Sequence, residues 1–159
     1  MYKVANRVVS HVVANLFHCW LLLPPPPGSY AYPPLHRSDG TPIGAVLGFC
    51  NMLNRLVLNN MMKGEQPRIA LVFDAKGKTF RHDIYEEYKA NRPPAPVDLV
   101  PQFGLIREVA KAYGIPQIEA PNFEADDVIA TLATMALKEG LDANVLSGDK
   151  DLMQLVTPT

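Results

Sequence analysis

The chain has 159 residues, of which 48% are hydrophobic, so it has the length of one domain and enough apolar residues for a core. Its formal net charge of −1 excludes an overall positive field, and a nucleic-acid partner would have to bind a local basic patch. The two cysteines, Cys19 and Cys50, lack the spacing of a metal site, and so few cysteines indicate a reducing compartment.

The N-terminal segment combines a basic start with an apolar run. Lys3 and Arg7 precede VVSHVVANLFHCWLLL, and four consecutive prolines follow at 24–27. This is the outline of a secretory or organellar presequence. Polar residues interrupt the run, however, and it is short for a membrane span, so we favour a buried first strand or a disturbed version of one. Residues 24–40 are predicted to be an extended connector, because proline fits neither a helix interior nor a central strand.

From residue 41 onward, helical and strand patterns alternate. Thr41 and Pro42 have the pattern of a helix start, and apolar residues at helical spacing predict a helix from there to about Asn60. The run RIALVF (68–73) predicts a strand buried on both faces. There follow a helix from 98 to 113, a short strand in IPQIEA, a helix over 125–139, a strand over 143–147 and a helix in GDKDLMQLV. This alternation predicts an α/β fold with a mainly parallel sheet.

Six carboxylates follow the predicted strands, and the carboxyl ends of parallel strands meet at one edge of a sheet. Taken separately, the acids at 124–127 and at 149–151 are equally well explained as helix-capping residues. Taken together they would repel one another strongly without a cation. Oxygen ligands with no His or Cys nearby favour Mg²⁺ or Mn²⁺ over Zn²⁺, and two such ions would suit in-line attack on a phosphodiester. The six acids are Asp74, Glu124, Asp126, Asp127, Asp149 and Asp151.

The stretch 76–92 is locally positive, with five basic residues against three acidic ones. Phe80, Tyr85 and Tyr88 add aromatic faces that could stack on unpaired bases. A solvated surface helix with i,i+4 charge pairs is the alternative explanation of the same composition. The basic residues are Lys76, Lys78, Arg81, Lys89 and Arg92.

Three spaced motifs carry a resemblance to a known family. VFDAKGKTFRHDIYEEYKANRPP, EADDVIATLA and SGDKDLMQLV, in this order, resemble the 5′-nuclease domain of bacterial DNA polymerase I and, more widely, the flap-endonuclease family of 5′–3′ exonucleases. The match is nearly continuous from about Tyr32. It divides the chain into an aberrant N-terminal segment with a proline-rich connector (1–31) and a 5′–3′ exonuclease N-terminal domain (32–159), which we expect to be incomplete at its C-terminus.

The resemblance implies a PIN-like (resolvase-like) α/β fold, with a mainly parallel sheet flanked by helices and a helical arch through which a single-stranded 5′ end is threaded. It implies that the six acids bind two Mg²⁺ or Mn²⁺ ions, and that Arg81, Lys89 and Arg92 contact the scissile phosphate and its neighbours as catalytic residues. The DNA-binding residues are expected to be Lys76, Lys78, Arg81, Tyr85, Tyr88, Lys89 and Arg92.

Two departures from the family pattern lead us to expect low or no nuclease activity from this chain. Members of the family begin with a strand that ends in Asp-Gly or a similar pair, which supplies another acid. Here CWLLLPPPPGSYAYPPL stands in that place; Leu21–Leu23 are expected to keep the end of the strand, and prolines replace the acid. The family also continues with a further acid pair and a helix–hairpin–helix that grips duplex DNA. A gene-model error upstream of about Gly28 is a competing explanation of the first departure.

The expected function is that of a metal-dependent 5′–3′ exonuclease and 5′-flap endonuclease module in primer removal and DNA repair. Its partners would be DNA with a single-stranded 5′ end or flap and a polymerase domain in the full-length protein, with no membrane. A cytoplasmic, nucleoid-associated location follows, with organellar targeting as the alternative. Two other functions stay open: a catalytically inactive DNA-binding remnant, and a PIN-type ribonuclease. The arch segment argues against the ribonuclease, which needs no threading device.

Overall fold

The computed structural model describes residues 9–14, 35–62 and 68–156, with side chains described outside 9–14 and 59–62. Nine elements follow one another along this part of the chain. They are β1 (Val9–Ala14), α2 (Gly44–Met62), β2 (Arg68–Val72), α3 (Phe80–Ile84), α4 (Val100–Ala112), β3 (Gln117–Ile118), α5 (Ala125–Lys138), β4 (Asp142–Leu146) and the 3₁₀ helix η1 (Lys150–Leu155). No helix among these residues is both long enough and apolar enough to cross a bilayer.

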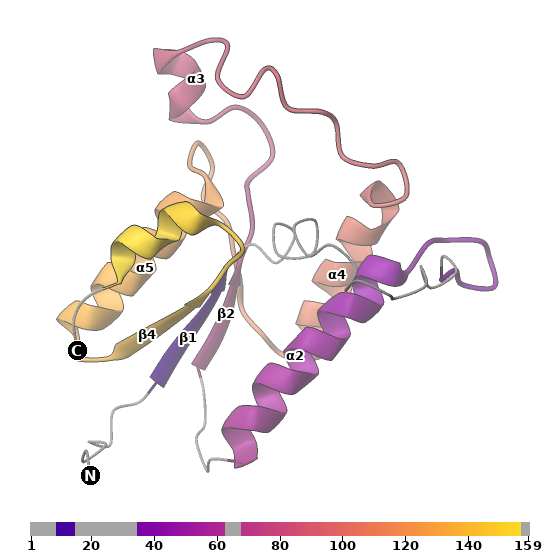
Figure 1. Ribbon diagram of the computed structural model, residues 1–159, viewed down its shortest axis with the longest axis horizontal. Coiled ribbons are helices and arrows are strands. Elements are labelled where there is room, and N and C mark those ends of the chain that lie inside the picture. Colours follow the sequence, from indigo (N-terminus) through magenta and orange to yellow (C-terminus); the bar gives the residue numbers. More distant parts are fainter. Residues whose placement is uncertain (1–8, 15–34, 63–67, 157–159) are drawn as a thin grey trace.

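The four strands form one parallel sheet in the order β3-β2-β1-β4, as the alternating pattern predicts. In the centre, Ala14 of β1 pairs with Val72 of β2, and Val13 pairs with Leu146 of β4. Figure 1 shows α5 on one side of the sheet and α2 with α4 on the other. Because every pair is parallel, the carboxyl ends of all four strands lie at one edge of the sheet.

The strand β2 contributes to a core on each face of the sheet. Leu71 and Phe73 pack with buried residues of α2 and α4, whereas Val72 packs with Ile129 of α5 and Leu152 of η1. This is the consequence of the two-residue period of a strand, whose successive side chains point to opposite faces. The apolar run at 68–73 is therefore explained by burial on both faces.

The helix α2 begins at Gly44, later than the predicted start at Thr41 and Pro42. Instead, Pro42 forms an antiparallel bridge with His36. The buried side chain of Gln102, on α4, accepts hydrogen bonds from the backbone N–H groups of Ala45 (2.8 Å) and Val46 (3.2 Å). A side chain from another helix thus satisfies donors that the first turn leaves open, and this sets the observed start.

Two further predictions concern the two ends of the chain. The described first strand is β1 (Val9–Ala14), and the expected strand end at Leu21–Leu23 and the prolines at 24–27 lie outside the described residues. The helix predicted in GDKDLMQLV is present as a 3₁₀ helix over Lys150–Leu155. Its first residues follow Asp149, whose side chain accepts a hydrogen bond from the backbone N–H of Asp151 at 2.9 Å.

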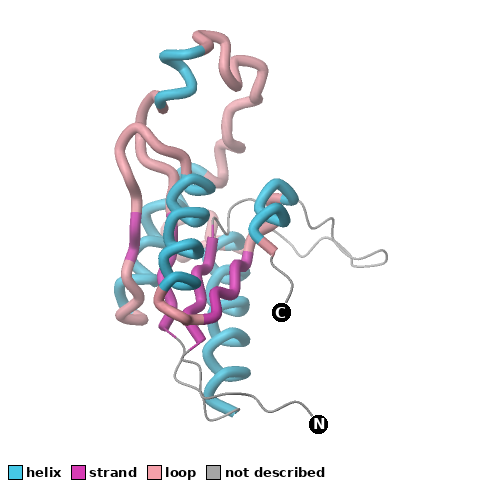
Figure 2. Tube along the Cα trace, turned by 90° about the vertical axis from the view of Figure 1, so that its left-hand side faces the viewer, coloured by secondary structure: helices cyan, strands magenta, loops and turns pink. Residues whose placement is uncertain are grey.

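Residues 75–99, here called the arch segment, leave the carboxyl edge of the sheet after β2 and return to α4 (Figures 1 and 2). Within this fully described stretch the only helix is α3, five residues long. Prolines at 93, 94 and 96 keep the returning limb extended. The segment has the place that the resemblance assigns to an arch, but most of it consists of turns and loop.

We predict that Ile129→Ala lowers the free energy of unfolding by about 2–5 kcal/mol, because Ile129 is 0% exposed and its truncation leaves a cavity between α5 and the sheet. Urea denaturation followed by circular dichroism measures the loss. Met135→Ala on the same helix is the control, since Met135 is 57% exposed. Equal effects of the two substitutions would contradict the assignment of this core.

Candidate functional site

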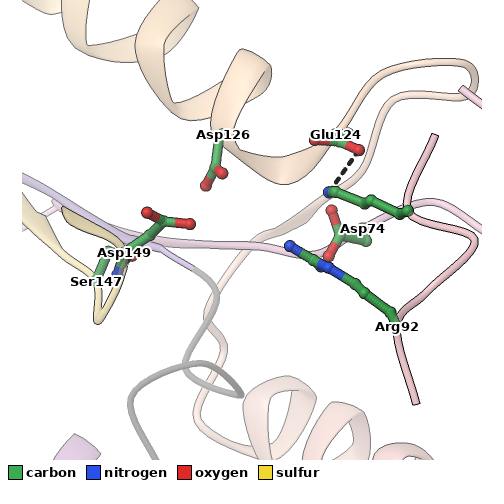
Figure 3. A pocket seen from close by; sticks show the side chains of 7 residues that line it. Asp74, Arg92, Glu124, Asp126, Ser147 and Asp149 are labelled. Carbon is green, nitrogen blue, oxygen red and sulfur yellow. Dashed lines mark hydrogen bonds and ion pairs between the residues drawn. The ribbon is translucent and has the colours of Figure 1, made fainter. Parts of the chain in front are cut away.

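A polar pocket lies at the carboxyl edge of the sheet (Figure 3). Four carboxylates reach it from three segments: the exit of β2, the start of α5 and the exit of β4. Two cations reach it from the arch segment. The lining residues are Asp74, Lys89, Arg92, Glu124, Asp126, Ser147 and Asp149. The structure therefore brings together four of the six acids expected from the sequence, whereas Asp127 and Asp151 do not line the pocket.

The start of α5 orders the acids around it through backbone hydrogen bonds. The Asp74 carboxylate accepts the backbone N–H of Ala125 at 2.8 Å, which ties the exit of β2 to the helix N-terminus. The Asp127 carboxylate accepts the N–H of Glu124 at 3.0 Å and completes a capping box. These carboxylates also lie where the helix dipole favours negative charge. Capping therefore accounts for part of the acid cluster without any ligand.

Asp126 is a partly buried carboxylate with other acids close to it. Burial raises its pKa, and the neighbouring carboxylates of Asp149 and Asp74 raise it further. Figure 3 shows the Asp126 and Asp149 side chains turned toward each other across the pocket. A cation between them would lower this repulsion.

Lys89 and Tyr88 of the arch segment both donate hydrogen bonds to the carboxylate of Glu124. The Lys89 ammonium lies 2.7 Å from Glu124 Oε1, and the Tyr88 hydroxyl donates to Oε2 at 3.3 Å. Of the three residues expected to be catalytic, Lys89 and Arg92 line the pocket, and Arg81 lies beside it. The remaining residues expected to bind DNA, Lys76, Lys78 and Tyr85, are exposed on the arch segment.

Arg81 is engaged mainly by Asp127, and its guanidinium also lies 3.8 Å from Oε2 of Glu124 in the pocket. Its guanidinium donates two hydrogen bonds to the Asp127 carboxylate, at 2.7 and 2.8 Å, and lies 4.6 Å from the ring centre of Phe80. The hydrogen bond from Arg81 is the main reason that the pKa of Asp127 is lowered. The pair joins the beginning of the arch segment to the first turn of α5, and no pattern in the sequence indicates it.

The chemistry of the lining fits a hard divalent cation such as Mg²⁺ or Mn²⁺, because its donors are carboxylate and hydroxyl oxygens without His or Cys. Asp74, Asp126 and Asp149 would hold the ion, with Glu124 as a further ligand. Within the described residues, no group of three His, Cys, Asp or Glu side chains is already gathered closely enough to hold a metal. The side chains would therefore have to converge on an ion.

Ser147 lines the pocket but was not predicted as a site residue. The only signal for it in the sequence is its position between β4 and Asp149.

We predict that Asp126→Asn stabilises the folded chain at pH 7 by up to ~1 kcal/mol, because it removes a charge that the pocket disfavours. A raised pKa means that the folded chain binds this proton more tightly than the unfolded chain, so stability falls as the pH rises above the ordinary value of 3.8. The advantage of Asn should accordingly shrink as the pH falls toward that value. Urea denaturation at pH 7 and pH 4 measures it, with Glu108→Gln on exposed α4 surface as the control. A loss of stability at pH 7 would contradict the prediction.

We also predict that Arg81 and Asp127 are energetically coupled. In a double-mutant cycle with Arg81→Met and Asp127→Asn, the coupling in unfolding free energy should be about 1 kcal/mol, since the pair is bidentate and only partly exposed. The matched control is the ion pair Arg107–Glu119, whose nitrogen and oxygen also lie 2.7 Å apart. Its side chains are more exposed, so its coupling in unfolding free energy should be smaller. Additive effects at Arg81 and Asp127 would contradict this role.

Comparisons with known proteins extend over most of the chain. A family profile described as the 5′–3′ exonuclease, N-terminal resolvase-like domain matches residues 29–159. DNA polymerase I of Rhizobium leguminosarum is 54% identical over 133 residues, covering 81% of this chain and 13% of that protein. A 5′–3′ exonuclease of Aquifex aeolicus (strain VF5) is 46% identical over 129 residues, covering 80% and 43%. The chain thus spans less than half the length of either relative.

Among solved structures, the fold is similar to a T5 5′-exonuclease described with bound divalent metal ions (zinc), with a TM-score of 0.56 and 16% sequence identity. The similarity covers 94% of this chain and 52% of that one. At this identity it supports the fold alone, and it agrees with the small parallel sheet and flanking helices described above.

Proposed function

The chain belongs to the family of 5′–3′ exonuclease N-terminal, resolvase-like domains, a family of hydrolases, and we propose that it is a metal-dependent nuclease module acting on DNA. The resemblance and the resolvase-like α/β fold predicted from the sequence are thereby confirmed. The proposed reaction is hydrolysis of a phosphodiester near a single-stranded 5′ end or flap, in primer removal and repair.

The observation that carries the proposal is the meeting of four carboxylates and two cations in one pocket. When bound, Mg²⁺ or Mn²⁺ would activate water and stabilise the attacking and leaving oxygens. Asp74, Asp126 and Asp149 would hold the metal from the exits of two strands and the start of α5. Lys89 and Arg92 would offset the charge that develops on the phosphate, as a catalytic pair on the arch segment.

The surface of the arch segment suits a single-stranded partner. Lys76 and Lys78 are exposed at its beginning, and the ring of Tyr85 is 58% exposed farther along. Exposed cations attract the phosphate backbone and aromatic rings stack on unpaired bases. Arg81 would support this surface through its contact with Asp127. Given such a substrate, we propose a cytoplasmic, nucleoid-associated location and, from the similarity to DNA polymerase I, a polymerase domain in the full-length protein.

A second candidate, DNA binding without chemistry, is favoured by one observation on the central strand. β1 lies between β2 and β4, yet the sequence contains no Asp or Glu before Asp39. The strand at the middle of the site therefore brings no carboxylate to the pocket. We propose on this basis that the activity of the chain is low, and that binding and cleavage must be measured separately.

We predict that the 159-residue chain binds a 5′-flap DNA and cleaves it slowly with Mn²⁺, and that Asp149→Asn lowers the cleavage rate at least about tenfold because it removes a metal ligand. A gel assay with end-labelled DNA measures cleavage, and fluorescence anisotropy measures binding. Glu108→Gln, which lies away from the pocket on α4, should keep the wild-type rate.

Three results would change the assignment. Binding to the flap without cleavage would support the inactive remnant. Faster cleavage of single-stranded RNA than of flap DNA would support a PIN-type ribonuclease. Cleavage that Asp149→Asn leaves undiminished would contradict a catalytic role for this pocket.

A further inference from the structure

The contact between Lys89 and Glu124 closes one side of the pocket. The Glu124 side chain is only 12% exposed, and one of its oxygens accepts from the Lys89 ammonium at 2.7 Å (dashed line in Figure 3). The other oxygen accepts from the Tyr88 hydroxyl at 3.3 Å. Both oxygens are therefore engaged by the arch segment. The Arg81 guanidinium also lies 3.8 Å from Oε2. A metal ion at this carboxylate would therefore have to share its oxygens with the Lys89 ammonium or displace it.

The backbone at Lys89 is held in an unfavourable conformation. Its φ of 59° lies in the left-handed region, which among the described non-glycine residues only Lys89 and Asn122 adopt. Such a conformation persists where the surrounding contacts hold it. The ammonium also lies 5.1 Å from the ring centre of Tyr88, next to the same carboxylate. The Lys89 side chain thus starts from an unusual backbone conformation and lies against both Tyr88 and Glu124.

The rest of the pocket still has an excess of negative charge. Its lining has four carboxylates against two cations, and Lys89 lies directly against Glu124. On the other side, Asp74, Asp126 and Asp149 line the pocket, and the Asp126 and Asp149 side chains are turned toward each other (Figure 3). A divalent ion would be attracted to that side, where it would repel the nearby ammonium and compete for Glu124.

We propose that Lys89 is an exchangeable internal counterion, which occupies Glu124 in the metal-free chain and is displaced from it when a divalent cation enters the pocket. The inference rests on the proposed metal-dependent function and adds a regulatory step to it. Displacement frees the ammonium to pair with a substrate phosphate, so metal entry and substrate engagement are coupled through one side chain. The Arg81–Asp127 pair does not line the pocket and keeps the beginning of the arch segment attached to α5 during the exchange.

The test is a calorimetric titration of Mn²⁺ into the full 159-residue chain and its variants. Lys89→Met removes the competitor while keeping its length, and should tighten Mn²⁺ binding about three- to tenfold. Arg92→Met removes the same charge from the lining without breaking an ion pair to Glu124 and should have a smaller effect. Lys111→Met, in the last turn of α4 before β3 and hence away from the carboxyl edge, should leave the affinity unchanged. Circular dichroism confirms that each variant is folded.

A second series of variants carries Glu124→Gln. It distinguishes displacement of Lys89 from Glu124 from a general effect of the Lys89 charge on Mn²⁺ binding. If Lys89 acts through Glu124, Lys89→Met should no longer change the Mn²⁺ affinity in this background. Equal or weaker binding by Lys89→Met, an equal gain with Arg92→Met, or a gain that persists with Glu124→Gln would each overturn the inference while leaving metal-dependent cleavage intact. Absence of Mn²⁺ binding in every variant would overturn the inference and the proposed function together.

Discussion

The repulsion among carboxylates at one edge of the parallel sheet is the constraint on which the rest of the site depends. Parallel strands deliver the residues that follow them to the same edge, so acids after β2 and β4 cannot be separated by the fold. The structure offsets their charge in two ways. Backbone N–H groups at the start of α5 stabilise Asp74 and Asp127, and cations of the arch segment engage Glu124 and Asp127. The repulsion that remains is seen at Asp126, whose pKa is raised by burial and by the carboxylates of Asp149 and Asp74.

The arch segment is attached to the sheet by polar contacts at its beginning rather than by helical structure of its own. The N–H of Phe80 donates to the carbonyl of Asn122 at 3.0 Å, and the Phe80 and Phe123 rings lie 5.7 Å apart. Arg81 adds its bidentate contact with Asp127. These contacts make the position of the segment depend on the turn before α5. The same turn presents the acids, so the cationic and anionic parts of the site are positioned by one local structure.

The features predictable from the sequence are those with a local period or a local spacing. The apolar run of β2 and the helical stripes of α4 and α5 repeat within a few residues, and the acids at strand exits follow from the parallel sheet. The contacts that were missed join distant residues. Gln102 sets the start of α2 from 57 positions away, and Arg81 engages Asp127 across 46. Single-sequence patterns contain no signal for such pairs, because each partner alone is an ordinary polar residue in the sequence. The bounds of β1 could not be predicted for a related reason: the N-terminal apolar run is longer than a strand, and nothing local selects Val9–Ala14 within it.

The central strand β1 brings no carboxylate to this edge of the sheet. This affects both the stability of the folded chain and the binding of a cation at the edge. Each acid added there raises the repulsion that the folded chain must offset, and each also adds a ligand for a cation. Because β1 adds none, the remaining acids come only from the segments on either side of it. Lys89 and Arg81 of the arch segment offset the charge of Glu124. The carboxylates of this pocket therefore repel one another less than they would with an additional acid between β2 and β4. Under the proposed metal-dependent function, the same feature would leave fewer ligands for an incoming ion, so that stability without metal and affinity for metal would be opposed in this pocket.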